Sequence, residues 1–229
     1  MIDLYFWTAP NGQKITILLE EAGLDYHIIP VNLGNREQYK PAFLALSPNH
    51  HIPVIIDQDP ADGGEPLKMI ESGAILLYLE QKSGKFMPSE LRARKQVLQW
   101  LFWEMSTLGQ MGAQFYFFNI RAAEKLPYAI EHYKSRARQD FVIMDQHLAE
   151  HEYLAGEYSI TDISCYPWVV NHAVYDQDLS ELPNLTSSAG LRPSRHVRRY
   201  SGPMPRTRKS TPASRWIDRT LYQKRLDRA

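Results

Sequence analysis

The sequence predicts an α/β unit over residues 1–84, followed by an all-α helical bundle over residues 89–185. Two patterns support this prediction. Strand-like and helix-like stretches alternate along the first 84 residues, whereas beyond Pro88 the apolar residues recur only at helical spacing. The chain has 229 residues, 44% of them hydrophobic, which is enough for two modest hydrophobic cores.

The first unit opens at Ile2 to Phe6, where branched and aromatic residues alternate in a way that predicts a central strand. The next apolar residues fall at helical spacing, and Gly23 predicts the end of that helix. The other predicted elements are strands over 26–31, 52–57 and 67–70, a short helix over 41–46, and a helix over 72–81 that packs through Ala74, Ile75, Tyr78 and Leu79. The order βαβαββα predicts one mixed sheet with helices on both faces.

The second unit is predicted to contain helices alone. Residues 97–108 and 130–148 keep helical spacing of their apolar side chains. A third helix is predicted to begin near Ser159, whose hydroxyl can cap the first turn while Asp162 returns the bond. We expect this capping box to have a structural role.

Cys165 is the only cysteine of the chain. A single cysteine excludes an internal disulfide and a cysteine-based zinc site, and it fits a reducing compartment. No basic residue or helix N-terminus adjoins Cys165, so it is predicted to be a small buried core residue and not a redox thiol. The pair His50 and His51 has no third ligand nearby, so no metal site is expected.

No apolar run reaches the roughly 18 residues of a membrane span, and no apolar leader with a cleavage site is present, so the protein is predicted to be cytoplasmic, without membrane contact. The 26 basic and 26 acidic residues balance overall. Residues 186–229, however, contain 12 Lys or Arg against Asp218 and Asp227. Three interpretations of this atypical Ser-, Pro- and Arg-rich tail remain open: a translated frame shift, a disordered extension, or a segment that binds acidic surfaces. Nucleic-acid binding is not expected, because no recognised motif organises the charges.

Six stretches of the chain resemble a known family. They are Pro10-Asn11-Gly12, Ser47-Pro48-Asn49 with Ile52-Pro53, residues 60–65, Glu71 to Ile75, residues 99–103, and residues 127–130. Together they resemble the soluble glutathione transferases, more narrowly the nu-class bacterial disulfide-bond oxidoreductases related to the yeast nitrogen-regulator prion protein. The resemblance covers about residues 1–185. It implies a thioredoxin-like domain followed by a helical domain, usually in a homodimer, with glutathione held on the first domain beside a cleft for the second substrate.

The position at which a thioredoxin-like redox protein carries a Cys-x-x-Cys pair holds Thr8-Ala9-Pro10-Asn11 here. The fold therefore lacks its own nucleophilic sulfur, and any thiol chemistry requires a bound sulfur compound. Asn11 stands at the start of the first helix, where its amide can donate to a glutathione sulfur and the helix N-terminus can favour the thiolate. An ordinary N-cap would look the same in the sequence. Many relatives carry Thr at the position of Ala9, which leaves the hydroxyl contact in doubt.

Glu71 and Ser72 open a predicted helix, so the backbone N–H groups there, with the Ser72 hydroxyl, form an anion site for the γ-glutamyl carboxylate of glutathione. Glu71 can accept from the glutathione ammonium. The alternative is that Ser72 is only an N-cap. The resemblance implies a cis peptide before Pro53, which turns the Ile52 backbone outward to pair with the cysteinyl part of glutathione. A trans proline at the start of an edge strand is the alternative.

Two further positions are candidate glutathione contacts from the resemblance. Gln38 matches a position that contacts the glycine end of glutathione, and an amide donor suits a carboxylate. A solvated surface glutamine is the alternative. His132 stands where close relatives carry Arg, and it would be a weaker anion partner that loses its charge near neutral pH.

These observations predict a glutathione-dependent enzyme that reduces small disulfides, with the thiol supplied by glutathione as co-substrate and with no metal. Two alternatives stay open. One is conjugation of glutathione to an electrophile, and the other is a non-catalytic glutathione-binding regulatory module.

Overall fold

The computed structural model describes residues 1–188 of the chain. They form two compact units, residues 1–85 and residues 86–188. Each unit is described by itself below. The first is a thioredoxin-like βαβαββα unit and the second is a helical bundle, as the sequence predicts.

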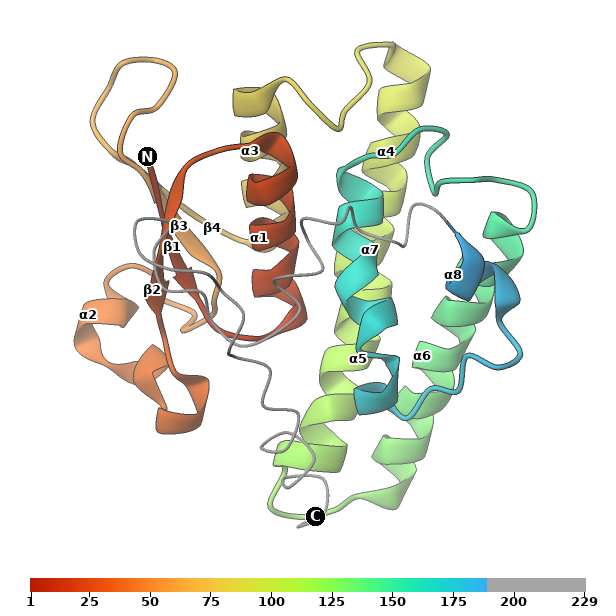
Figure 1. The fold of residues 1–229 in the computed structure, drawn as a ribbon. Coiled ribbons are helices and arrows are strands. Elements are labelled where there is room, and N and C mark those ends of the chain that lie inside the picture. Colours follow the sequence, from red (N-terminus) through yellow and green to blue (C-terminus); the bar gives the residue numbers. More distant parts are fainter. Residues whose placement is uncertain (189–229) are drawn as a thin grey trace, which may run out of the picture. The chain divides into compact units, whose positions relative to one another are not determined.

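The first unit is built on a four-stranded mixed sheet with the strand order β2-β1-β3-β4 (Figure 1). Its strands are β1 (Ile2–Phe6), β2 (Tyr26–Pro30), β3 (Val54–Asp57) and β4 (Leu67–Ile70). β1 runs parallel to β2 and antiparallel to β3, and β3 runs antiparallel to β4. Val54 lies opposite Tyr5 on one side and opposite Ile70 on the other. The start of β3 therefore meets the ends of β1 and β4 at one edge of the sheet.

Helices cover both faces of this sheet, with α1 (Pro10–Ala22) and α3 (Ser72–Ser83) on one side and α2 (Pro41–Leu44) on the other (Figure 1). α1 ends at Gly23, which adopts the left-handed conformation (φ 76°) that favours glycine. At the other end of α1, a Cβ on Gly12 would lie 2.7 Å from the Trp7 carbonyl oxygen. Only glycine allows the first turn of α1 to approach the end of β1 so closely.

The packing face of α3 agrees only in part with the prediction, which shares Ile75 and Leu79 with it. The buried side chains follow helical spacing along one stripe, and they belong to Ser72, Ile75, Leu76, Leu79 and Glu80. Ala74 was predicted to pack inward but is exposed. The inward stripe lies on the Leu76 side of Ile75, and an alanine carries too little apolar surface to reveal from the sequence which side faces the core.

Residues 86–188 form a bundle of helices. These are α4 (Leu91–Trp103), α5 (Gly109–Tyr116), α6 (Pro127–Leu148), α7 (Ile160–Val170) and α8 (Pro183–Ser187), with π-helical turns at Glu104–Leu108 and Phe117–Arg121. α7 begins with the predicted capping box of Ser159 and Asp162. None of the helices within residues 1–188 is long and apolar enough to cross a bilayer.

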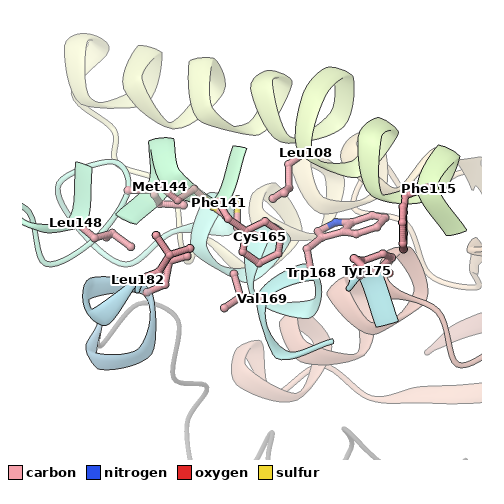
Figure 2. Close-up of a cluster of buried hydrophobic side chains, with 12 residues drawn as sticks. Leu108, Phe115, Phe141, Met144, Leu148, Cys165, Trp168, Val169, Tyr175 and Leu182 are labelled. Atoms are coloured by element: carbon pink, nitrogen blue, oxygen red, sulfur yellow. The ribbon is translucent and has the colours of Figure 1, made fainter. Parts of the chain in front are cut away.

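The core of the bundle surrounds Cys165. Figure 2 shows its side chain among Leu108, Phe141, Met144 and Trp168, and Cys165 itself is 0% exposed. This confirms the prediction of a small buried core residue. A thiol in such surroundings is inert because its thiolate, the reactive form, is penalised by the loss of water.

The last described helix, α8, ends at Ser187 and so includes the first two residues of the predicted tail. The other predictions for residues 186–229 concern positions 189–229, which lie outside the described residues.

Asp140 on α6 is a buried carboxyl, 2% exposed, whose Oδ2 has no hydrogen-bond partner among the described residues. Burial raises the pKa of Asp140 to about 6, against a smaller opposing effect of Arg136. The unfolded chain releases this proton near pKa 3.8. Between pH 4 and 6 the folded state therefore holds a proton that the unfolded state has lost, and stability falls as pH rises through this window.

Asp140→Asn removes this titration. Relative to the unmodified protein, we expect the variant to gain up to about 3 kcal/mol of unfolding free energy between pH 4 and 7. Urea unfolding at a series of pH values measures the difference, and Glu124→Gln, at an exposed acidic residue of the same unit, is the matched control. Parallel pH curves for the unmodified protein and Asp140→Asn would contradict the assignment.

Candidate functional site

Three chain segments meet at the sheet edge where β3 begins. They are the connection from β1 into α1, the peptide that precedes β3, and the turn from β4 into α3. Ile52, Trp7, Ala9 and Ile70 share one apolar cluster there. Of the residues predicted from these segments, Ile52 belongs to this cluster, and Pro53 and Glu71 directly follow members of it in the chain. Asn11 and Ser72 each lie two positions beyond a member of the cluster.

Asn11 is the second residue of α1, after Pro10 at the first position, and the N-cap is Ala9. The alternative that Asn11 is the N-cap is therefore wrong. The Asn11 side chain is exposed and makes no hydrogen bond with any other residue in 1–188. An amide beside the first turn of a helix is thus available to a ligand, in a position where the helix favours negative charge.

The Ile52–Pro53 peptide bond is cis, so the alternative of a trans proline is wrong. The Ile52 side chain is buried in the apolar cluster, 8% exposed. The paired register of β3 begins only at Val54. The Ile52 peptide therefore lies outside the strand ladder, so its backbone N–H and C=O groups do not pair with a neighbouring strand.

Glu71 is the N-cap of α3 and Ser72 is its first residue. The alternative that Ser72 is the N-cap is therefore wrong. Glu71 adopts φ 68° and ψ 113°, a positive φ that is uncommon for a residue other than glycine. Its carboxylate is exposed, whereas Ser72 is 5% exposed. The first N–H groups of α3 have no acceptor within the helix, so an acidic group and a set of anion-binding donors stand side by side.

Gln38 lies in the 3-10 turn η2 (Glu37–Tyr39) and is 6% exposed. The alternative of a solvated surface glutamine is therefore wrong. Its Oε1 has no partner among the described residues. The turn is held by Glu37, which accepts from the Asn32 N–H and from Lys40 Nζ, both at 2.8 Å. Hydrogen bonding from Lys40 is the main effect that lowers the pKa of Glu37. The amide of Gln38 is thus a buried polar group with unused hydrogen-bonding capacity.

His132 belongs to the second unit. It is exposed on α6, with its ring 6.2 Å from the ring of Tyr128 and 5.1 Å from that of Tyr133. Its ring contacts are thus with aromatic side chains, while the residue stays exposed.

No group of three or more His, Cys, Asp or Glu side chains within residues 1–188 gathers in a way that could hold a metal ion. The His50 ring packs 4.8 Å from the Tyr39 ring and 5.4 Å from the His51 ring. The two imidazoles make aromatic contacts in this arrangement.

Sequence reasoning missed one connection within the site. Asn49 Nδ2 donates a hydrogen bond to Glu71 Oε1 at 3.2 Å, across 22 positions of the chain. The available signal was the Ser47-Pro48-Asn49 stretch close upstream of the Ile52–Pro53 pair, which contributed to the family resemblance but was given no role at the site.

Three features define the class of this protein: a mixed sheet with a cis-proline before β3, an acidic N-cap before α3, and a separate helical unit. Together they are typical of thioredoxin-like proteins that bind a thiol compound on the first domain. The comparisons with known proteins agree. A profile described as "Glutathione S-transferase, N-terminal domain" matches residues 4–86. The chain is 52% identical over 170 residues to the disulfide-bond oxidoreductase YfcG of Escherichia coli, a match that covers 74% of this chain and 79% of that protein. The chain belongs to the glutathione S-transferase family.

Two solved structures are also similar. One is a glutathione transferase family member from Pseudomonas fluorescens with two glutathione bound, at 37% identity and a TM-score of 0.73, covering 83% of this chain and 84% of that one. The other is a glutathione transferase from Pseudomonas putida with one glutathione disulfide per subunit, at 36% identity and a TM-score of 0.73, covering 83% of each chain.

Proposed function

We propose that this protein is a glutathione-dependent enzyme that reduces small disulfides, in which bound glutathione supplies the reacting thiol. The observation that carries the proposal is the placement of the only cysteine. Cys165 is buried in the bundle core, whereas the polar groups suited to a charged thiol peptide gather on the first unit. The similarity to a disulfide-bond oxidoreductase, and to structures that hold glutathione or its disulfide, supports the same function.

Glutathione binds along the edge at the start of β3. The Glu71 carboxylate accepts from the ammonium, while the Ser72 hydroxyl and the first N–H groups of α3 hold the γ-glutamyl carboxylate. The Ile52 backbone, beside Pro53, pairs with the cysteinyl part of the tripeptide. This arrangement places a group of opposite charge against each of the two charged groups on the α-carbon of the γ-glutamyl residue.

The other contacts act on the rest of the tripeptide. The Nε2 of the Gln38 side-chain amide donates to the glycine carboxylate. Asn11 donates to the glutathione sulfur and, with the N-terminus of α1, stabilises the thiolate. His132, on α6 of the second unit, is a further candidate contact for an anionic group of a ligand.

In the proposed reaction the glutathione thiolate attacks one sulfur of the substrate disulfide. This forms a mixed disulfide and releases one substrate thiolate. A second glutathione thiolate attacks the glutathione sulfur of the mixed disulfide, which forms glutathione disulfide and releases the other substrate thiolate. The protons lost by the two glutathione thiols balance those taken up by the two substrate thiolates. The protein contributes position and electrostatic stabilisation.

The proposal includes a homodimer in the cytoplasm. A chain with a single cysteine has no internal disulfide to maintain, which fits a reducing compartment. The family resemblance implies pairing of subunits. Light scattering after gel filtration tests the assembly: a dimer has twice the 26.5 kDa mass of the chain.

Calorimetric titration with reduced glutathione tests the proposed site. We expect Glu71→Ala to weaken binding about 10- to 100-fold, because it removes a charged acceptor of the ammonium. Glu65→Ala, at an exposed acidic residue upstream of β4, is the matched control and is expected to bind as the unmodified protein does. Equal affinity of Glu71→Ala and the control would contradict the site.

Turnover distinguishes the proposed reaction from its alternatives. The unmodified protein is assayed with a model disulfide and with an aromatic halide, each in the presence of glutathione. Reduction of the disulfide supports the proposal, and conjugation of the halide alone would replace it with transfer to electrophiles. Binding without either reaction would indicate a regulatory module.

A further inference from the structure

The loop between α2 and β3 contains a buried serine that bonds to two different parts of the loop. Ser47 is 0% exposed. Its hydroxyl accepts from the His51 N–H at 3.2 Å and lies 2.8 Å from the His51 carbonyl oxygen and 2.7 Å from Asn49 Oδ1. Because a hydroxyl has a single proton, these two acceptors share it. Ser47 thus ties the peptide just before Ile52 to the side chain of Asn49.

Asn49 extends this network to the other side of the site. Its Nδ2 donates to Glu71 Oε1 at 3.2 Å and lies 3.5 Å from His51 Nδ1. Asn49 is the one side chain within residues 1–188 that hydrogen-bonds the Glu71 carboxylate. The exposed Glu71 side chain would otherwise sample several rotamers, and fixing them on binding costs free energy.

The chemistry of an amide suits this position. Asn49 carries no charge, so it orients the carboxylate without neutralising it and without competing electrostatically with an incoming ammonium. It occupies Oε1 and leaves Oε2 to accept from a ligand. A lysine or arginine at the same place would form an ion pair with Glu71 that the ligand would have to displace.

Building on the proposed function, we propose that Asn49 is a positioning residue for glutathione, because it orients the Glu71 carboxylate toward the ammonium. Ser47 hydrogen-bonds both Asn49 and His51, the residue before Ile52, and so holds Asn49 beside the Ile52 peptide. The two halves of the binding site, before β3 and before α3, are thereby fixed by one hydrogen-bonded loop. Preorganisation of this kind raises affinity by lowering the cost of ordering on binding.

The test compares reduced glutathione with its desamino analogue, in which the γ-glutamyl ammonium is absent. Calorimetry on Asn49→Ala is expected to show about five- to tenfold weaker binding of glutathione and an unchanged affinity for the analogue. Asn35→Ala, at an exposed asparagine of the same unit, is the matched control and is expected to alter neither affinity. Thermal unfolding of both variants verifies that the fold is retained.

A double variant tests whether Asn49 affects glutathione affinity through Glu71. In the Glu71→Gln background, Asn49→Ala is expected to cause no further loss of glutathione affinity. Three outcomes would each overturn the positioning role. Asn49→Ala could weaken the binding of glutathione and of the analogue equally, could weaken neither, or could cause the same loss of glutathione affinity in the Glu71→Gln background as in the unmodified protein. Failure of the unmodified protein to bind glutathione would instead reject the proposed function itself, and the positioning role with it.

Discussion

Asn11→Ala is expected to lower kcat/KM for glutathione-dependent disulfide reduction by about 100- to 1000-fold, the usual effect of removing one donor to a reacting anion. Asn11 is exposed beside the first turn of α1, and its amide makes no hydrogen bond with another residue in 1–188. Its loss removes a donor from the glutathione sulfur but leaves the contacts of the γ-glutamyl group in place. Glutathione affinity is therefore expected to change by less than about threefold.

The pH profile gives a second measurement of the same role. Without the donor, the thiolate is less stable, so the pKa of the bound glutathione thiol rises and the activity profile moves to higher pH. Asn11→Ser, which retains a donor, is expected to recover part of the activity. An unchanged pH profile together with weakened glutathione binding would mean that Asn11 binds the tripeptide without acting on its sulfur.

Asp162→Ala is expected to destabilise the bundle by about 3–5 kcal/mol. The Asp162 side chain is 0% exposed and accepts from the Leu154 N–H at 3.0 Å, the Ser159 N–H at 3.0 Å and the Ser159 hydroxyl at 3.1 Å. Alanine leaves two buried backbone donors without an acceptor, and each costs about 1–3 kcal/mol. The capping box would also lose its reciprocal bond.

Urea unfolding followed by tryptophan fluorescence measures this loss, since Trp100, Trp103 and Trp168 lie in the bundle. Ser159→Ala is a graded comparison and is expected to cost about 1 kcal/mol, the usual value for an N-cap. A loss for Asp162→Ala no larger than that of Ser159→Ala would contradict the account of the buried donors.

Much of the first unit could be predicted from the sequence because its elements leave periodic patterns. The alternation from Ile2 to Phe6 and the glycine stop at Gly23 both appear in the structure as expected. The two 3-10 turns at Leu33–Asn35 and Glu37–Tyr39 were not predicted. They depend on hydrogen bonds that the backbone N–H groups of Asn32 and Asn35 donate to side chains, and such bonds leave no periodic pattern of apolar residues in the sequence.

The candidate site was only partly predictable. Residues adjacent in the chain, such as Ile52 with Pro53 and Glu71 with Ser72, were singled out because they resemble the motifs of a known family. The bond from Asn49 to Glu71 depends on the sheet bringing the start of β3 beside the end of β4, so it becomes visible only in three dimensions.

The central claim is that the reacting thiol belongs to bound glutathione and not to the protein. Steady-state reduction of a model disulfide by Cys165→Ala and Cys165→Ser, with folding verified by circular dichroism, tests it most directly. Cys165 is 0% exposed, so the account predicts that both folded variants turn over at rates within about twofold of the unmodified protein and only in the presence of glutathione. Loss of turnover in both folded variants that still bind glutathione would contradict it.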